Sequence, residues 1–463
     1  MIDERAAKRV LALQVVVVFF AVTAGNMVNV ALPTIGADFG VSEGTYGWIV
    51  TGYMLTFAVF SAIHGRLADR VGARRLYLAG ILVFGFGSAL TAALPNIESI
   101  IAVRMLQGAG AAGLPSIGTL IIARVFPPEK RGAASGVLLA GLGVAASIGP
   151  FLGGALVQAF RWQAVFLFSS VSLVTFPFAA RLLPRELDAR GHTTIDWVGA
   201  ALMTVGASLL IYSFDLLAHR EFGLKLIALL AAGVLALVGL AVWIRRVSIP
   251  FIHPEVFADV RYSAAVAVGF LNQATRMGTV VLVPILLHDV DGLAPIWVGA
   301  VLLPGALLIA ALSPITGRLS DRVGARKLVL GASVCMIIGD LVMATTTGAS
   351  VVGVTIGMTI FGLGFSFLHS PLLGAVTKIL PPRHAGIGLG MFMTIFLLGA
   401  AFGIATSITA LELQADDAPS WLGLSLGGGA PFSNATLVLS ALSLLGLLLV
   451  PWLSGKDPRP PGE

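Results

Sequence analysis

The chain has 463 residues, of which 57% are hydrophobic and only 11% are charged, whereas a soluble globular domain carries roughly 25% charged residues. This composition excludes a soluble enzyme and predicts a protein that lies in a membrane along its whole length. The formal net charge of +6 does not indicate nucleic-acid binding, because the basic residues are divided among many short segments.

Apolar segments follow one another along the chain, and fourteen of them are long enough to cross a hydrocarbon core about 30 Å thick. The connections between them are too short for a separate soluble domain, which needs roughly 50 residues or more. The sequence therefore predicts an all-α polytopic membrane protein. The predicted transmembrane helices are 10–32, 46–64, 76–94, 97–123, 133–159, 163–182, 197–217, 224–243, 262–287, 295–316, 328–347, 350–376, 385–411 and 432–453.

The basic residues predict the orientation of these helices. If the N-terminus is cytoplasmic, 24 of the 29 Lys and Arg residues fall in cytoplasmic segments, and Arg161, Arg220 and Lys225 fall outside. Cytoplasmic loops of membrane proteins carry such an excess of basic residues. An even number of helices then places both termini in the cytoplasm. The other two basic residues, Arg104 and Arg276, lie within predicted helices.

The chain contains an internal repeat. The segment 65–76 returns as 317–328, at an offset of 252 residues, with ten of twelve positions identical. Helices one to six therefore repeat as helices nine to fourteen, and helices seven and eight are left as a central pair. Two six-helix bundles related by an axis along the membrane normal are an architecture of transporters. We expect an N-terminal bundle over 1–182, a two-helix insert with cytoplasmic linkers over 183–260, and a C-terminal bundle over 261–463.

The repeated segment and this helix pattern resemble the major facilitator superfamily, and within it the fourteen-spanner drug:proton antiporters, including tetracycline efflux proteins of the Gram-positive type. The resemblance implies that the repeated loop is a cytoplasmic gate between conformations. Its glycines permit tight turns, and its aspartate can pair with arginines or cap a helix. A solvated charge cluster that only sets topology is the alternative. The candidate gating residues are Gly65, Asp69, Arg70, Gly72 and, in the second copy, Asp321.

The fourth predicted helix contains Arg104 and, one turn later, Gln107. The glycines that follow match a dinucleotide-binding pattern formally, but that pattern must follow a strand, and here it lies inside a membrane helix. An arginine within a membrane is a functional-site hypothesis by default. The family resemblance implies that Arg104 faces the central cavity and influences proton movement. A structural role, in which Arg104 binds a helix carbonyl, is the alternative.

The fifth predicted helix contains a segment, 147–154, that resembles the signature separating exporters from symporters in this superfamily. Proline removes a backbone donor and bends a helix, while glycines leave a groove for a neighbouring helix. The outward direction of transport therefore comes from the resemblance, because the chemistry alone predicts only helix packing. The residues concerned are Gly149, Pro150, Gly153 and Gly154.

Polar residues in other helices are candidates for a substrate cavity. The resemblance also leads us to expect a carboxylate near Gly25 and another near Ala400, and both are absent, which weakens an assignment of a tetracycline chelate as substrate. The candidate cavity residues are Asn26, Asn29, Gln107, Asn272, Gln273 and Arg276.

Asp340 is the one carboxyl group that the prediction places well within a span, and we expect it to carry the coupled proton. Burial favours the neutral form of a carboxyl group, which a proton carrier needs in one of its states. Arg104 and His369 complete the predicted coupling group, and His64 is a further candidate. The alternatives are a salt bridge from Asp340 to an arginine and a neutral, hydrogen-bonded His369.

The sequence is therefore interpreted as a proton-coupled efflux antiporter that exports amphipathic drugs across the bacterial cytoplasmic membrane. Its expected partners are a small amphipathic substrate, protons and lipid, and we expect a monomer with no cofactor, metal or nucleic acid. An exporter of an anionic lipid, fatty acid or metabolite is the alternative, because Arg104 and Arg276 suit anionic cargo. A non-transporting membrane sensor or scaffold is a third possibility.

The predicted topology can be tested by labelling. In a Cys335→Ser background, we expect single cysteines at Ser42 and Ala415 to react with an impermeant thiol reagent added outside intact cells. Cysteines at Arg190 and Ala325 should react only after the cells are opened, because their loops are cytoplasmic. Labelling of either of these two from outside would overturn the orientation.

Overall fold

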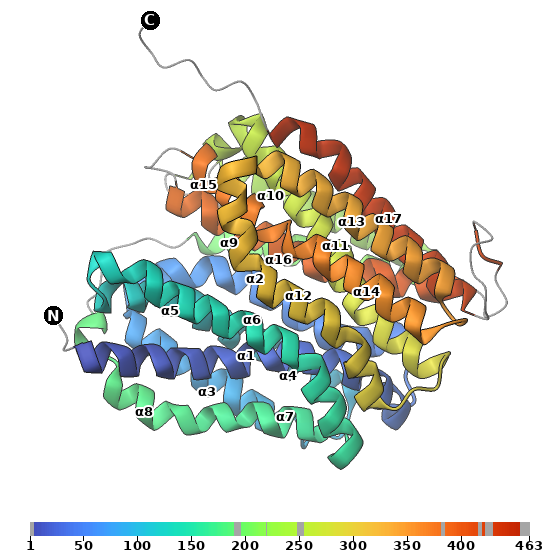
Figure 1. Cartoon of the computed structure of the whole chain (residues 1–463), viewed down its shortest axis with the longest axis horizontal. Helices are drawn as coiled ribbons and strands as arrows, with labels where there is room; N and C mark the ends of the chain where they lie inside the picture. Colours follow the sequence, from blue (N-terminus) through green and yellow to red (C-terminus); the bar gives the residue numbers. More distant parts are fainter. Residues whose placement is uncertain are drawn as a thin grey trace, which may run out of the picture.

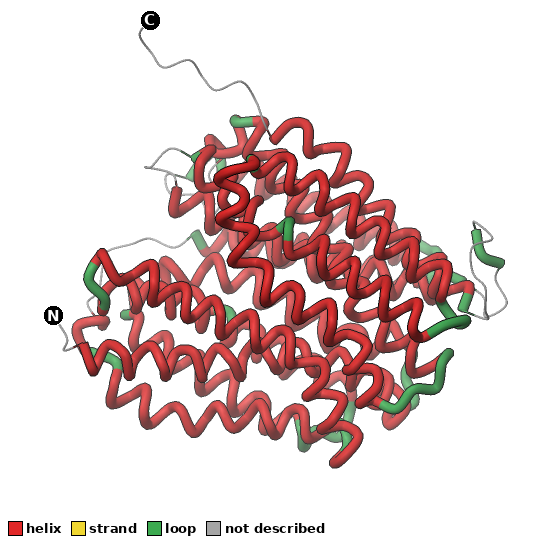
Figure 2. The backbone as a smooth tube through the Cα atoms, viewed as in Figure 1, coloured by secondary structure: helices red, strands yellow, loops and turns green. Residues whose placement is uncertain are grey.

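The computed structural model describes residues 4–188, 196–218, 220–247, 254–380, 385–414, 419–421 and 429–453. Every regular element within these ranges is a helix, as Figure 2 shows. A hydrocarbon core offers no partner for backbone N–H and C=O groups, so a spanning segment must satisfy them internally, and a helix does so. The all-α fold predicted from composition is confirmed.

The first six spans are built from eight α-helices. Two of these spans are interrupted: the fourth changes helix at Ala112, and the sixth passes through a short 3-10 helix. The elements are α1 (Glu4–Phe39), α2 (Glu43–Val71), α3 (Ala73–Thr91), α4 (Ile97–Ala111), α5 (Gly113–Val125), α6 (Pro128–Phe160), α7 (Gln163–Ser170), η1 (Val171–Val174), α8 (Thr175–Leu182) and η2 (Arg185–Asp188).

The remainder of the chain forms a helical pair and then six further spans, of which the twelfth is interrupted between Ser366 and His369. The elements are α9 (Trp197–Ala218), α10 (Leu224–Trp243), η3 (Pro254–Ala258), α11 (Val260–Asp289), α12 (Pro295–Val323), α13 (Ala325–Thr346), α14 (Val351–Ser366), α15 (His369–Ile379), α16 (Ala385–Glu412), α17 (Ala430–Leu449) and η4 (Val450–Leu453).

Thirteen helical segments in the described ranges are long and apolar enough to cross a membrane. The helix α2, with 29 residues, is the remaining predicted span and brings the number to fourteen. The predicted spans are all found, but several helices continue beyond them; α1, for example, begins at Glu4 and α6 at Pro128. Apolar length marks the part of a helix that lies in lipid, not the turns that continue into the polar interface.

The internal repeat is visible in the backbone. Gly72 separates α2 from α3 with φ of 102°, and Gly324 separates α12 from α13 with φ of 91°. In each case the glycine N–H donates to a carbonyl four residues earlier, at Ala68 and Ser320 respectively. A positive φ is readily adopted only by glycine, so both copies of the loop need this residue to turn sharply.

The helices form two bundles that diverge toward one end of the molecule, where α1 begins (Figure 1). We call this end the terminal face and the other end the opposite face. The first bundle holds α1 to α8, and the second holds α11 to α17. The helix α9 packs against α2 of the first bundle and α16 of the second, and α10 packs on α9.

Close contacts between the bundles lie toward the opposite face. The start of α12 crosses α6 so tightly that a Cβ atom added at Gly154 would collide with the carbonyl oxygen of Pro295. Likewise, a Cβ atom at Gly299 would lie 2.6 Å from the carbonyl oxygen of Pro150. At the other edge, Glu412 at the end of α16 accepts a hydrogen bond of 2.5 Å from the backbone N–H of Gly44 in α2. The two bundles therefore meet backbone to backbone near this face.

We predict that Gly154→Ala destabilises the protein by about 1–3 kcal/mol, the usual cost of overpacking a close contact. Gly136→Ala, in the same helix, is the matched control, because an added Cβ atom there meets nothing within 4 Å. Alanine favours a helix more than glycine does, so the control should be neutral or stabilising. Thermal unfolding in detergent measures both variants. Equal effects of the two substitutions would contradict the close contact.

Candidate functional site

Two adjoining hollows, of about 690 and 420 Å³, lie between the bundles. The larger is lined by α1, α2, α5, α6, α11 and α16, and the smaller by α1, α6, α11, α12 and α14. They share Asn26, Ala146 and Arg276, so together they form one central cavity.

The lining of the central cavity is apolar apart from a few side chains. Asn26 and Arg276 line both hollows, and Gln273 and Tyr53 line the larger one. Gln273 and Arg276 are three residues apart on α11 and so share a helix face. Among the described residues that line the two hollows, Arg276 is the only charged one. A ligand in the cavity therefore meets one cation in apolar surroundings.

The guanidinium of Arg276 has few acceptors around it. Its Nη1 donates to the sulfur of Met277 at 3.5 Å, and its Cζ lies 4.6 Å from the ring centroid of Phe365. Its Nε is buried without a hydrogen-bond partner. In the described part of the chain no carboxylate lies within ion-pair distance of it. Thioether sulfur is a weak acceptor, so this cation retains donor capacity.

Arg104 is placed differently from the sequence prediction. It is only 1% exposed and lines neither hollow. Its Nε donates to the carbonyl of Ile49 at 3.2 Å, its Nη1 donates to Oε1 of Gln107 at 2.8 Å, and its Cζ lies 4.0 Å from the ring centroid of Tyr53. Tyr53 itself lines the larger hollow, so its ring separates Arg104 from the cavity.

Gln107 is a member of the same network and not a cavity residue. Its Nε2 donates to the hydroxyl groups of Ser88 at 3.2 Å and Thr91 at 3.3 Å, both in α3. Together with Arg104, it ties α4 to α2 and α3. The expectation that Arg104 and Gln107 face the central cavity is therefore not met, because both side chains pack inside the first bundle.

Asn29 and Asn272 also line neither hollow. Asn29 is fully buried in α1, and neither of its side-chain polar atoms has a hydrogen-bond partner. Asn272 is fully buried in α11, where its Nδ2 donates to the carbonyl of Val268 at 2.9 Å, and it packs against Gly446 of α17. Asn272 faces α17 while its neighbour Gln273 lines the cavity, because one residue along a helix rotates the side chain by about 100°.

Asp340 lies in α13, one helix away from the cavity. It is fully buried; its Oδ1 accepts a hydrogen bond of 3.4 Å from Thr279 of α11, and its Oδ2 has no partner. The salt bridge to an arginine that the sequence left open is absent from the described residues. Asp340 is thus connected to the helix that carries Arg276, although it does not line the cavity.

The two candidate histidines are held in different ways. His369 begins α15 at the break in the twelfth span, and its ring centroid lies 4.9 Å from that of Phe396 and 6.1 Å from that of Phe365. Because Phe365 also packs against Arg276, a chain of stacked groups connects this break to the cavity. His64 is paired through its Nδ1 with the carbonyl of Phe60, at 2.6 Å.

The candidate gate lies on the terminal face, outside the cavity. Asp69 pairs with Arg124 of α5 at 3.4 Å, and both side chains are more than a third exposed. Arg74 donates to the carbonyls of Ala180 at 2.7 Å and Leu183 at 3.0 Å, and so caps the end of α8, where carbonyl groups run out of helical partners. Arg70 is exposed, and the side chains of Gly65, Arg66 and Asp321 lie outside the described residues.

The glycines of the predicted antiporter segment are packing positions. A Cβ atom at Gly149 would lie 2.8 Å from that of Asn26, and one at Gly153 would lie 2.7 Å from the carbonyl of Met27, so both glycines let α6 approach α1. Gly154 faces α12 of the other bundle. Pro150 lies between these contacts and lines the smaller hollow.

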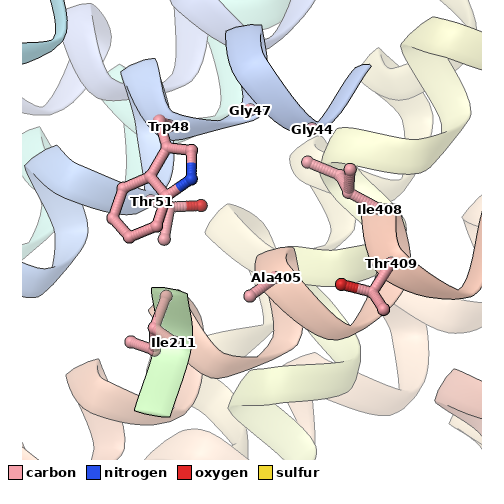
Figure 3. A pocket seen from close by; sticks show the side chains of 8 residues that line it. All are labelled: Gly44, Gly47, Trp48, Thr51, Ile211, Ala405, Ile408 and Thr409. Atoms are coloured by element: carbon pink, nitrogen blue, oxygen red, sulfur yellow. The ribbon is translucent and has the colours of Figure 1, made fainter. Parts of the chain in front are cut away.

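A third hollow, of about 260 Å³, lies where α9 meets the contact between α2 and α16 (Figure 3). Trp48 and Thr51 of α2, Ile211 of α9, and Ala405 of α16 point into it. Thr409 of α16 also donates to a carbonyl of α9 at 3.0 Å. No residue of α9 or α10 is among the described residues lining the central cavity. The helical pair therefore packs over the junction of the bundles.

Several residues of the site carry no signal in the sequence. Tyr53, Thr279 and Phe365 are ordinary membrane-helix residues, and only the fold brings them beside Arg104, Asp340 and Arg276. The helix-end contact of Glu412 was missed because that residue was assigned to an external loop.

The comparisons with known proteins agree with this architecture. A family model described as Major Facilitator Superfamily matches residues 15–404. The riboflavin transporter RibZ of Clostridioides difficile is 28% identical over 83% of this chain and 85% of its own. The puromycin resistance protein pur8 of Streptomyces alboniger is 31% identical over 86% of this chain and 79% of its own. A crystal structure of the peptide transporter POT with sulfate superposes with a TM-score of 0.68 at 20% identity, covering 98% of this chain and 99% of that one.

The network around Arg104 leads to a prediction about stability. Gln107→Leu should destabilise the protein by about 1–3 kcal/mol, because it leaves a buried guanidinium donor without its acceptor. Gln273→Leu is the matched control, because it makes the same change at a buried glutamine whose Oε1, unlike that of Gln107, has no hydrogen-bond partner. We expect the control to unfold at the wild-type temperature or above. Similar losses of thermal stability in both variants would show that the network contributes nothing particular.

Proposed function

The chain belongs to the major facilitator superfamily and is a membrane transporter, not an enzyme, and we propose that it exports amphipathic, drug-like compounds in exchange for protons. The observation that carries the proposal is the central cavity, which is lined by both bundles and lies beside their close contacts at the opposite face. A cavity shared by two bundles can open to either side when the bundles rock about the substrate.

The excess of basic residues on the terminal face supports a cytoplasmic position for this face and for both termini. In that orientation the bundles diverge toward the cytoplasm and are joined toward the outside, which is the conformation that receives a substrate for export. The membrane is then the cytoplasmic membrane of a bacterium. Because one chain supplies both sides of the cavity, a monomer suffices for transport.

The largely apolar lining of the cavity, with a few polar side chains in it, supports an amphipathic substrate. The similarity to a puromycin resistance protein favours a drug, whereas the similarity to a riboflavin transporter favours a metabolite with an aromatic ring system. Both kinds of compound combine an apolar surface with polar groups. The substrate class is therefore defined by chemistry common to both and not by one compound.

Protons are the energy source that we propose. An inward proton at a membrane potential of about 150 mV releases roughly 3.5 kcal/mol, enough for a substrate gradient of a few hundred-fold. Asp340 is our candidate for the proton carrier, because it is a buried carboxyl group with one unpaired oxygen and a hydrogen bond to α11. A change in its protonation alters its bond to Thr279 and so reaches the helix of Arg276.

The loop residues Gly65, Asp69, Arg70, Gly72 and Asp321 are proposed to stabilise one conformation of the terminal face. The pair between Asp69 and Arg124 and the capping of α8 by Arg74 support this role, because they fix the loop to its own bundle. Asp69→Asn should slow transport in vesicles while leaving substrate binding unchanged.

Proteoliposomes test the proposed function directly. An imposed proton gradient should drive accumulation of the substrate, and the substrate should in turn cause a proton flux that empty liposomes lack. The compounds to be compared are puromycin, riboflavin, a fluoroquinolone and a fatty acid. Transport of any of them by the protein without a linked proton flux would exclude antiport with protons.

We predict that Asp340→Asn abolishes accumulation driven by a pH gradient in inverted vesicles and preserves downhill exchange of substrate. Exchange needs the bundles to move but needs no net proton transfer, so only the first assay depends on the carboxyl group. Asp291→Asn, in the loop between α11 and α12, is the control and should retain both activities. Full pH-driven accumulation by Asp340→Asn would move the coupling site to His369 or His64.

A further inference from the structure

We propose that the substrates are amphipathic anions and that Arg276 binds their acidic group. The inference rests on the proposed function, because it names the substrate class of the same cavity. It is carried by the lining of the cavity, in which Arg276 is the one charged side chain among the described residues, and by the weakness of the acceptors that the structure gives Arg276.

The two arginines of the membrane helices differ in their acceptors and in their position, although each has one buried nitrogen without a hydrogen-bond partner, Nη2 in Arg104 and Nε in Arg276. Arg104 has a backbone carbonyl, the amide oxygen of Gln107 and the face of Tyr53 around it, and it is separated from the cavity. Arg276 has only a thioether sulfur and the face of Phe365. A buried cation without acceptors is costly, so the surroundings of Arg276 favour a ligand that supplies the missing acceptors.

The geometry fits a planar acidic group. Phe365 packs against the guanidinium, with Cζ 4.6 Å from its ring centroid, and the Arg276 side chain lines the hollow in which a ligand would lie. A guanidinium edge matches the two oxygens of a carboxylate or sulfonate in a bidentate arrangement. Because Arg276 borders both hollows, an acidic group there lets the apolar part of the substrate extend into either one.

The other side chains of the cavity suit the rest of such a molecule. Asn26 and Gln273 are neutral and can pair with hydroxyl, carbonyl or amide groups, while Met54, Phe57 and Leu397 offer apolar surface. A cationic substrate meets the like charge of Arg276 at low dielectric constant and has no carboxylate in the lining to offset it. The cavity therefore selects against cations as well as for anions.

Two dyes of the same scaffold test the proposal. Anilinonaphthalene sulfonate is an amphipathic anion, and phenylnaphthylamine is its neutral counterpart without the sulfonate. Binding is measured by calorimetry on protein in lipid nanodiscs, with empty nanodiscs subtracted. We expect Arg276→Gln to weaken sulfonate binding roughly ten- to a hundred-fold, the range of a hydrogen bond to a charged group, and to leave amine binding unchanged.

Arg161→Gln is the control for net charge, because it removes one positive charge at the opposite face, where the Arg161 side chain is 73% exposed. It should bind both dyes as the wild type does. Arg276→Lys keeps the charge but loses the planar fork, and we expect an intermediate affinity for the sulfonate. If Arg276→Gln does not fold, binding by the wild-type protein still tests the preference for anions. The wild type should then bind the sulfonate more tightly than the neutral amine and the cation ethidium.

Equal binding of sulfonate by wild type and Arg276→Gln, or wild-type preference for ethidium, would overturn the proposal. The measurement uses no proton gradient, so it fails or succeeds independently of the proposed antiport. Selective binding of the sulfonate without proton flux in proteoliposomes would refute the transport mechanism alone. Proton-coupled export of a cation with no dependence on Arg276 would refute the substrate class alone.

Discussion

A guanidinium inside a membrane must find acceptors in the protein, because lipid supplies none. The first bundle supplies two acceptors to Arg104, for its Nε and Nη1, by joining α2, α3 and α4 through Ile49, Gln107 and the two hydroxyl groups beyond it, while Nη2 has no partner. That network holds Tyr53, and with it this part of the cavity lining, in place. At Arg276 the partners are weaker, a thioether sulfur and an aromatic face, and the side chain lines the cavity. The need of a guanidinium for acceptors therefore accounts for two features: a network that fixes the first bundle, and a cation between the bundles that can bind a ligand.

Rigid bundles can move against each other only where few side chains interlock across their contact. Glycines supply such a surface at the opposite face, where Gly154 and Gly299 bring the backbones of α6 and α12 together. Few side chains need to change rotamer when such surfaces slide or separate. The helical pair α9 and α10 packs across the outer side of α2 and α16 and contributes to neither hollow of the central cavity in the described part of the chain.

The number of spans and the repeated loop could be predicted because each depends on a local property of the sequence. Apolar length gives the spans, and a glycine at Gly72 and Gly324 gives the turn that only this residue readily adopts. The direction in which each polar side chain points, toward the cavity or toward a neighbouring helix, could not be predicted. In a soluble protein an apolar stripe marks the buried face, but in a membrane helix the lipid face is apolar too, so the pattern does not say whether a residue such as Asn29 faces the cavity or a neighbouring helix.

Rocking of the two bundles about the central cavity is the central claim, and a pair of distances measured by pulsed electron resonance tests it most directly. In a Cys335→Ser background, spin labels at Arg70 and Arg322 report on the terminal face, and labels at Ser42 and Val290 report on the opposite face. When substrate and pH are changed, we expect the first distance to shorten in the population whose second distance lengthens. Two distances that stay constant, or that change in the same direction, would contradict alternating access by rigid bundles.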